Sequence, residues 1–553
     1  MIKGKSISRF AGLRQLHRFM RDEQGTLIVF GLVLTVVMLM GGGLAVDLMR
    51  HEERRTEIQQ TLDRSVLAAT NMSQKLDPED VVNDYFDKAG LLSQLSNVQV
   101  EEGLNFRRVT AQAQSDVPTY FMHLMDIQNL PVNAGSAAEQ RITNVEISLV
   151  LDISGSMQNQ PTRISNLRVA AAEFVDTVLS KDSEGKISIS LIPYNGQVNL
   201  GSALFAEFNA SNTHNFPKSH CLDLPSSIYD TDELSTSTSF PQSGFFDSFS
   251  GGGTSANAYT AYSGPLHNGT SYVNVWCQPN ADNIIRPFQN DIASLQGAID
   301  NLIAVGATSI DLGMKWGLAL LSPTSRDVIT NLNTNGIVPD DFIGRPLDFD
   351  AEDTMKIIVL MTDGQHFAEE RLNDDFRSGP SEIRRSKGDG MLSIRHFESG
   401  ANYGRYWVPH LGRWMDDPWN SGKGVNRLDW SEVWAEYRMQ WIARQLYARA
   451  FGGNNSSWRN FHFNQAMNNF RSRTPTGEMD TRLQEVCSVA KANDILIYGI
   501  AFEAPENGAT QIQNCATTAD SHYYYVTTDG EGLSIQSAFR SIANNISQLR
   551  LTQ

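Results

Sequence analysis

The sequence is short of basic residues. Lysine and arginine number 45 against 62 aspartates and glutamates, so the formal net charge is −17. Nucleic-acid binding requires an excess of Lys and Arg to neutralise phosphates, and no basic stripe with interleaved aromatic residues occurs here, so we expect no nucleic-acid partner. The length of 553 residues and the 41% hydrophobic content exclude a disordered tail or a fibrous repeat, and allow two or three globular units.

The common catalytic signatures are absent as well. The sequence contains no Gly-x-Ser-x-Gly elbow, no His-Glu-x-x-His motif and no Gly-x-x-x-x-Gly-Lys loop. His366 lies close to Asp363, but one histidine near scattered serines does not make a catalytic triad. We therefore expect a protein that is not an enzyme.

Cysteine is rare, and its four positions show no Cys-x-x-Cys pair and no Cys/His cluster of zinc spacing. Four cysteines allow three pairings, and their order along the chain favours two local loops, Cys221 with Cys277 and Cys487 with Cys515. In an exported protein we expect these pairs to be disulfides. In a cytosolic protein they would be four buried free thiols.

Charged residues are also absent from a stretch near the N-terminus, between Glu23 and Asp47. As a helix this stretch would be about 35 Å long, enough to cross a hydrocarbon core of about 30 Å. It lacks the polar face of a soluble helix, so we expect a transmembrane helix over 25–46. The alternative is a cleaved signal peptide with a site at Gly43-Leu44-Ala45, for which the apolar region is long.

Basic residues flank this segment unequally. Residues 1–24 carry six basic and two acidic residues, whereas four arginines follow the segment over a comparable span. This bias favours a cytoplasmic N-terminus, with 1–24 as a basic head and the body outside the cytoplasm.

Beyond the apolar stretch the helical pattern continues as an amphipathic helix to about Met72. Its apolar positions recur at helical spacing among charged and amide side chains: Ile58, Leu62, Val66 and Ala69. Short strands are predicted at 98–100 and 109–113, near an apolar segment at 120–125. We expect residues 47–144 to form a membrane-proximal helix and a small α/β region.

From residue 145 to 553 apolar strands alternate with helices. The predicted strands cover 145–151, 187–192, 356–361, 495–500 and 523–526, and the predicted helices include 164–179 and 533–549. Because the strands are apolar on both faces, we expect an α/β fold with a doubly wound, mostly parallel sheet covered on both sides. Two large insertions interrupt it, at about 200–283 and 366–480.

The two insertions differ in composition. The first is rich in Ser, Thr, Asn and Gly, which predicts loops held by Cys221 and Cys277. The second holds seven of the nine tryptophans, and a capping box of Asp429 and Glu432 would start a helix there. One face of that helix would carry Trp430, Val433, Trp434, Tyr437, Trp441 and Ile442. We expect a satellite aromatic core, with a partner-binding aromatic surface as the alternative.

Oxygen-bearing side chains come from three segments at one edge of the predicted sheet. Asp152-Ile153-Ser154-Gly155-Ser156 follows the first strand, Thr308 precedes a helix, and Asp363 follows the strand 356–361. Ligands bind outside the carboxyl ends of strands in such a sheet. Two carboxylates and three hydroxyls are hard donors, suited to Mg²⁺, Mn²⁺ or Ca²⁺ rather than zinc.

Each of these segments also has a purely structural interpretation. Ser154 or Ser156 could cap the following helix, and Thr308 with Asp311 could form a capping box. Asp363-Gly364 could be a simple turn. The three segments together nevertheless predict a metal site.

This pattern of Asp152-x-Ser154-x-Ser156, Thr308 and Asp363 resembles the metal-ion-dependent adhesion site (MIDAS) of von Willebrand factor type A domains. The resemblance implies that the serines and the threonine are hydroxyl ligands and that the aspartates are direct or water-mediated ligands. It implies a divalent cation, with Mg²⁺ favoured over Ca²⁺ or Mn²⁺. An open coordination position would take an acidic residue from a protein partner.

The N-terminal segment is similar to that of TadE/TadG-like Flp pilus-assembly proteins. The residues that carry this similarity are Gln24-Gly25, Phe30, Gly43, Ala45-Val46-Asp47, Asp63 and Ala68-Ala69. A cleaved prepilin of this class carries Glu five residues after the leader glycine, but Phe30 stands there, so an uncleaved anchor is expected.

Together the two resemblances imply an accessory protein for assembly of Tad/Flp (type IVb) pili. It would be a single-pass protein of the bacterial inner membrane with a periplasmic body, and its metal site would bind other pilus-assembly components. The alternative is a metal-dependent cell-surface adhesin or matrix-binding protein. An adhesin predicts a surface-sorting or stalk segment, which the sequence does not show.

Overall fold

The structure is a computed structural model in which the chain forms two compact units, Met1–Arg141 with Gln548–Gln553, and Ile142–Ser547. The described residues are 24–71, 76–102, 106–141, 144–159, 161–180, 182, 185–214, 216, 219–251, 258–262, 274–351, 354–398, 400–527 and 533–549. Residues 1–23 of the predicted basic head lie outside them.

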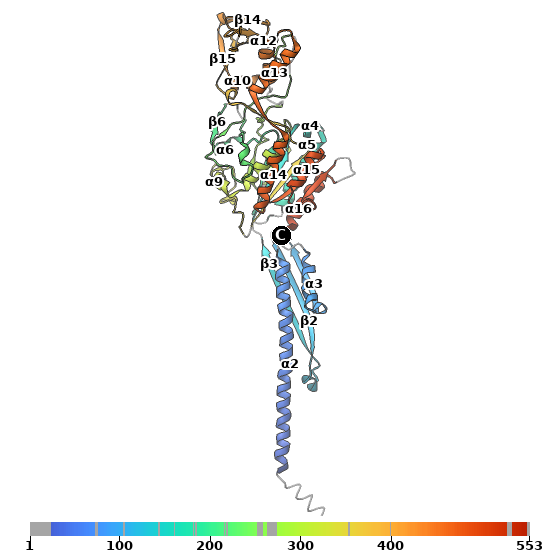
Figure 1. Cartoon of the computed structure of the whole chain (residues 1–553). Coiled ribbons are helices and arrows are strands. Elements are labelled where there is room, and N and C mark those ends of the chain that lie inside the picture. Colours follow the sequence, from blue (N-terminus) through green and yellow to red (C-terminus); the bar gives the residue numbers. More distant parts are fainter. Residues whose placement is uncertain are drawn as a thin grey trace, which may run out of the picture. The chain divides into compact units, whose positions relative to one another are not determined.

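The first unit is built on one long helix, α2 (Gln24–Thr70), which Figure 1 shows as a continuous element. The apolar side chains near its N-terminus are largely exposed. Within the described part of the chain, α2 is the one helix long and apolar enough to cross a membrane. The predicted apolar helix and its amphipathic continuation are confirmed as a single helix up to Thr70, and the predicted end at Met72 lies outside the described residues.

The C-terminal half of α2 packs against a three-stranded antiparallel sheet of β1 (Leu95–Glu102), β2 (Phe106–Pro118) and β3 (Asn129–Arg141). The four apolar residues predicted to share a helical face, Ile58, Leu62, Val66 and Ala69, are all fully buried in this core. The sequence did not predict β3, because its run of Asn, Ala, Gly and Ser residues has low strand propensity. A helix, α3 (Pro78–Lys88), completes the unit.

A six-stranded sheet organises the second unit, with the order β18-β17-β9-β4-β5-β8. Five strands run parallel: β4 (Asn144–Asp152), β5 (Ile187–Tyr194), β9 (Thr354–Thr362), β17 (Leu496–Phe502) and β18 (Tyr523–Val526). The edge strand β8 (Arg286–Gln289) runs antiparallel to β5. Every residue of β5 and β17 is buried, so both faces of the sheet are covered. The predicted α/β architecture with a mostly parallel sheet is confirmed.

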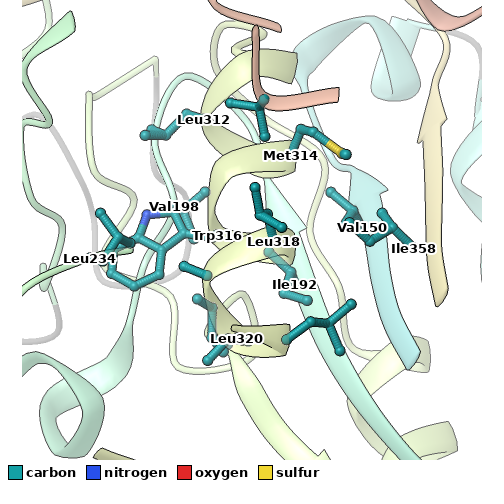
Figure 2. Packing of buried hydrophobic residues seen from close by; sticks show 14 of the residues in the cluster. Val150, Ile192, Val198, Leu234, Leu312, Met314, Trp316, Leu318, Leu320 and Ile358 are labelled. Carbon is teal, nitrogen blue, oxygen red and sulfur yellow. The ribbon is translucent and has the colours of Figure 1, made fainter. Parts of the chain in front are cut away.

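Helix α8 (Ile310–Leu321) lies against the middle of this sheet. Figure 2 shows Val150, Ile192 and Ile358, from three adjacent strands, beside Met314 and Leu318 of α8. On the other side of the helix, Trp316 lies near Val198 and Leu234. All twelve residues of α8 are buried, including the charged side chains of Asp311 and Lys315, so the helix is enclosed on every side.

Further helices of this unit flank the sheet or pack on one another. They are α4 (Gly155–Asn159), α5 (Pro161–Leu179), α7 (Ile292–Asp300), α14 (Thr476–Ala492), α15 (Glu506–Cys515) and α16 (Ile535–Leu549). Helix α14 joins the core around α8, whereas α5 contacts β5 and meets α16 through Phe174 and Phe539, whose ring centroids are 5.8 Å apart.

The first insertion consists mostly of loops, as predicted, with short elements at α6 (Gly201–Phe205), β6 (Ala210–Ser211) and β7 (Phe240–Pro241). Cys221 and Cys277 form a disulfide within it, and Cys487 and Cys515 link α14 to α15. The predicted pairing is confirmed, and the alternative of four free thiols is wrong.

The tryptophan-rich insertion has its own sheet and shares its core with Phe246 and Trp276 of the first insertion. Five antiparallel strands lie in the order β14-β13-β12-β11-β15, at Arg413–Met415, Tyr406–Val408, Leu392–Arg395, Pro380–Ser386 and Val425–Asp429. They pack with α10 (Trp430–Glu436), α11 (Met439–Ile442), α12 (Arg449–Gly452) and α13 (Ser456–Phe470). Figure 1 shows α10, α12, α13, β14 and β15 gathered at one end of the second unit, apart from α14, α15 and α16.

The predicted capping box of Asp429 and Glu432 is present at the start of α10. The predicted aromatic face, however, does not belong to one helix, because the backbone becomes extended at Tyr437 (φ −127°, ψ 139°) and α11 starts afresh at Met439. Trp430, Trp434 and Trp441 are still buried in a common cluster, so the satellite aromatic core is confirmed.

Replacing both Cys487 and Cys515 by serine is expected to lower the free energy of unfolding by about 3 kcal/mol, because the bond restricts the unfolded chain between α14 and α15. Urea unfolding followed by far-UV circular dichroism measures this change. Ser488→Ala, at an exposed position of α14, is the matched control. A double variant that unfolds at the same urea concentration as the parent would contradict the expectation.

Candidate metal centre

The predicted site residues lie at the carboxyl edge of the central sheet. Asp152 ends β4, and Asp363 directly follows β9. Because β4 and β9 are parallel neighbours, with Leu151 opposite Met361, their ends lie side by side. Thr308 stands two residues before α8, which packs on the same two strands. A pocket of about 650 Å³ opens at this edge, lined in part by Ser156, Thr308 and Asp363.

The carboxylate of Asp152 is completely buried and held from two sides. The backbone N–H of Ser154 donates to its Oδ1 (2.8 Å), and the Thr362 hydroxyl donates to its Oδ2 (2.7 Å). The first contact forms within the loop itself, and the second comes from the neighbouring strand. The position of Asp152 therefore depends on the pairing of β4 with β9.

A chain of oxygen atoms runs from this loop to Asp363. The hydroxyls of Ser154 and Ser156 are 2.9 Å apart, and the Ser156 hydroxyl donates to Asp363 Oδ1 (2.6 Å). A Cβ atom placed on Gly364 would lie 3.6 Å from Ser156 Oγ and 3.7 Å from Thr308 Oγ1, so Thr308 approaches the same point. The structure thus brings the five predicted ligands to one place.

Gly155 allows the loop to lie against the segment before α8. Its N–H donates to the carbonyl oxygen of Gly306 (2.9 Å), and a Cβ on Gly155 would approach that oxygen to 3.0 Å. A larger residue would push the two segments apart, and would separate Ser156 from Thr308.

The capping alternatives are not realised among the described contacts. The Ser154 hydroxyl contacts Ser156, and the Ser156 hydroxyl donates to Asp363. The N-cap of α8 is Ser309, which makes no side-chain cap, while Asp311 lies close to His366 and Arg482. The metal interpretation itself remains a prediction.

The electrostatics of the cluster favour a positive charge. Burial, with repulsion from Asp363, raises the pKa of Asp152 to about 7. Burial also raises the pKa of Asp363, although hydrogen bonds from Ser156 and Arg163 oppose this shift. Two neighbouring buried carboxylates with hydroxyl oxygens beside them are a donor set that fits a hard divalent cation.

Arg163, on the first turn of α5, was not predicted to belong to the site. Its Nη1 lies 2.9 Å from Asp363 Oδ2, and its Nη2 lies 2.6 Å from Glu503 Oε2, just beyond β17. The guanidinium donates to Oδ2 of Asp363, so Oδ1 is left to accept from the Ser156 hydroxyl. No local sequence pattern marks Arg163 or Glu503, because their contacts join segments 340 residues apart.

His366 connects three parts of the structure. Its Nδ1 is 2.7 Å from Asp480 Oδ1 on α14, and its Nε2 accepts the backbone N–H of Asp311 on α8 (3.1 Å). The ring is buried, so it fixes the loop that follows Asp363. The first insertion also reaches the site, since Phe249 and Trp276 line the pocket.

Comparison with known proteins gives one family match. Residues 24–72 match the family of TadE/G-like Flp pilus-assembly proteins, which confirms the predicted resemblance of the N-terminal segment. No curated protein sequence matches the chain.

Among solved structures the likeness is distant. The chain is 12% identical to the pilus adhesin SpaC from Lactobacillus rhamnosus GG, with 82% of this chain and 33% of SpaC covered and a TM-score of 0.28. It is 13% identical to the vWF domain of the type V pili tip protein Mfa5 from Porphyromonas gingivalis, with 73% and 95% covered and a TM-score of 0.29. Proximal thread matrix protein 1 from the mussel byssus, with a zinc-occupied MIDAS motif, is 10% identical, with 74% and 46% covered and a TM-score of 0.24. The chain thus spans about a third of the length of SpaC.

In a chelating buffer, the stability of the protein is expected to fall as the pH rises from about 4 to about 7. The folded-state pKa of Asp152 is about 7, above the value of 3.8 for an unperturbed Asp, so over this range the folded state binds more protons than the unfolded state. Asp152→Asn stays neutral at this position and should show a smaller decline, because the raised pKa of Asp363 preserves part of it.

Thermal unfolding midpoints measured from pH 4.5 to 8 test the expectation. Asp375→Asn, at an exposed position, is the control and should follow the parent. Identical pH profiles for the parent and Asp152→Asn would contradict it.

Proposed function

We propose that this protein is an accessory protein for assembly of Tad/Flp (type IVb) pili. The observation that carries the proposal is the match of residues 24–72, a stretch that contains helix α2, to TadE/G-like pilus-assembly proteins. The protein would act by holding other pilus-assembly components rather than by catalysis, in keeping with the lack of catalytic signatures in its sequence.

In this proposal residues 25–46 span the bacterial inner membrane, with 1–24 in the cytoplasm and 47–144 next to the membrane in the periplasm. Residues 145–553 form a von Willebrand A-like domain with insertions at about 200–283 and 366–480. The exposed apolar surface of α2 supports the spanning segment. The parallel sheet with oxygen ligands at its carboxyl edge supports the domain assignment.

The metal site would bind a partner through a divalent cation, with Mg²⁺ favoured over Ca²⁺ or Mn²⁺. Asp152, Ser154, Ser156, Thr308 and Asp363 offer five oxygen ligands, whereas these ions commonly take six or more. The cation supplies a concentrated positive charge at the pocket. An acidic side chain of the partner would complete the coordination, and Arg163 adds a second positive charge on the same wall.

Asp152→Ala is expected to weaken Mg²⁺ binding by about 3 kcal/mol, roughly 100-fold in Kd, because a buried charge loses its counter-charge. Ser154→Ala removes a neutral ligand and should weaken Mg²⁺ binding by about 1 kcal/mol, roughly fivefold in Kd.

Arg163→Gln should strengthen Mg²⁺ binding, because it removes a positive charge that competes with the cation for Asp363. Isothermal titration calorimetry on the full chain in detergent measures all three.

Asp375→Ala serves as the control, because this exposed aspartate lies outside the cluster. In cells, site-specific crosslinking from the pocket rim should capture a partner with the parent and not with Asp152→Ala. A folded Asp152→Ala protein with unchanged Mg²⁺ affinity, partner capture and pilus output would refute the metal-dependent part of the proposal.

Protease added to spheroplasts is expected to digest the body and to leave a small membrane-bound N-terminal fragment, because the body is proposed to be periplasmic. Immunoblotting against an N-terminal tag detects the fragment, and a cytoplasmic protein serves as the intactness control. A fully protected body would reverse the proposed orientation. A body recovered from the cell surface would favour the adhesin alternative.

A further inference from the structure

The turn between β2 and β3 carries an unusual group of exposed apolar side chains. We call residues Thr119–Gln128, which include the 3₁₀ turn η2 (Met122–Met125), the β2–β3 tip. Leu124 is 76% exposed and Tyr120 is 67% exposed, and Phe121 and Met125 are exposed as well. No Lys, Arg, Asp or Glu occurs between Asp116 and Asp126.

Asp47 of α2 holds this tip. Its side chain is only 1% exposed and accepts three consecutive backbone N–H groups, from Tyr120 (2.9 Å), Phe121 (2.7 Å) and Met122 (2.7 Å). Hydrogen bonds to a carboxylate are stronger than those between neutral groups, so three of them fix the tip firmly. Nearby, Arg50 donates to the carbonyl oxygen of Pro118 (3.1 Å) and lies over the ring of Tyr120 at 4.1 Å.

From Asp47 the tip extends along α2 toward the N-terminus. The ring of Phe121 sits directly on Gly43, where a Cβ would come within 2.3 Å of it. The tip and α2 together line an apolar pocket of about 270 Å³, to which α2 contributes Val36, Leu39, Met40 and Leu44. At 1.5 Å per residue, Val36 lies about 16 Å along the helix from Asp47.

This depth falls within the stretch of α2 proposed to span the membrane. We propose that the β2–β3 tip is inserted into the periplasmic leaflet, where lipid acyl chains cover its apolar side chains. The inference rests on the membrane-spanning role of residues 25–46 under the proposed function. The protein would then contact the bilayer twice, through α2 and through the tip.

Two features point to lipid as the occupant. The exposed apolar surface of the tip is continuous with that of α2 through the shared pocket, so both meet the same environment. Backbone groups of the tip also have partners: Asp47 accepts three N–H groups, Leu124 N–H bonds to Phe121 O, and Asp126 N–H bonds to His123 O. Such satisfaction is required of a turn in hydrocarbon.

The boundary of the insertion is marked by Tyr120 and Arg50. A tyrosine ring with a neighbouring arginine is typical of the interface between hydrocarbon and water. Asp47 lies one helical turn before Arg50, so its buried carboxylate marks the level at which the tip enters the bilayer. Asp47 is thus a positioning residue that sets the depth of the tip.

Spin labelling of the full chain in phosphatidylethanolamine–phosphatidylglycerol vesicles tests the proposal. All four native cysteines are in disulfides, so an introduced cysteine is the sole reactive thiol. A label at Leu124→Cys should be accessible to oxygen and inaccessible to a water-soluble nickel chelate. Leu34→Cys on α2 is the lipid control, and Gln99→Cys on β1 is the water control.

A Leu124 label that matches Leu34 supports the proposal. A label open to the nickel chelate places the tip in water, and one shielded from both reagents means that a protein covers it; either result overturns the proposal. If the Leu34 label itself is open to the chelate, the spanning segment of the proposed function fails, so the two failures are distinguishable.

Asp47→Ala tests how the tip is held. The variant should increase the mobility of the Leu124 label and its exposure to the nickel chelate, while the Leu34 label stays unchanged. Asp63→Ala, on the same helix, is the matched control, since Asp63 accepts only from Gln59 among its described contacts. Unchanged accessibility at Leu124 in Asp47→Ala would overturn the positioning role of Asp47.

Discussion

The parallel pairing of β4 with β9 is the interaction on which the candidate metal centre depends. It sets Leu151 opposite Met361, so that the next residues, Asp152 and Thr362, meet through a 2.7 Å hydrogen bond. Helix α8 packs on the same strands and delivers Thr308 to their ends. Because these strands are buried on both faces, their register cannot slip without exposing the core. The oxygen atoms at the ends of the strands are therefore held in fixed positions.

Two buried aspartates show how the surroundings of a carboxylate decide its role. Asp47 accepts three backbone N–H groups, which compensate for its removal from water, and it serves to hold a turn. Asp152 accepts two hydrogen bonds and faces a second carboxylate, so burial and repulsion raise its pKa. Such a pair is stabilised by a cation, whereas Asp47 needs none. The same side chain is therefore structural in one unit and a candidate ligand in the other.

Much of the fold was predictable because it follows from local periodicity. The five parallel strands carry apolar residues on both faces, and the buried face of α2 has strict helical spacing, so both were predicted within a few residues. The strands β3 and β8 were not predicted, since one is poor in β-branched residues and the other has four residues. The aromatic face at 430–442 has helical spacing, yet α10 ends before Tyr437, where the backbone is extended, and α11 starts at Met439.

The sequence by itself determined which side chains could bind a cation, because Asp152, Ser154 and Ser156 lie in one loop and Thr308 and Asp363 stand next to recognisable elements. It also determined the apolar length of α2. Only the tertiary structure decided what surrounds these residues: Arg163 and Glu503 beside Asp363, Phe249 and Trp276 on the pocket wall, and the contact of Asp47 with the β2–β3 tip. The physical reason is the distance along the chain between the residues in contact. Periodicity shows which residues close together in the sequence share a face of a helix or strand. These contacts instead join segments up to 340 residues apart, which meet only once the sheet has formed.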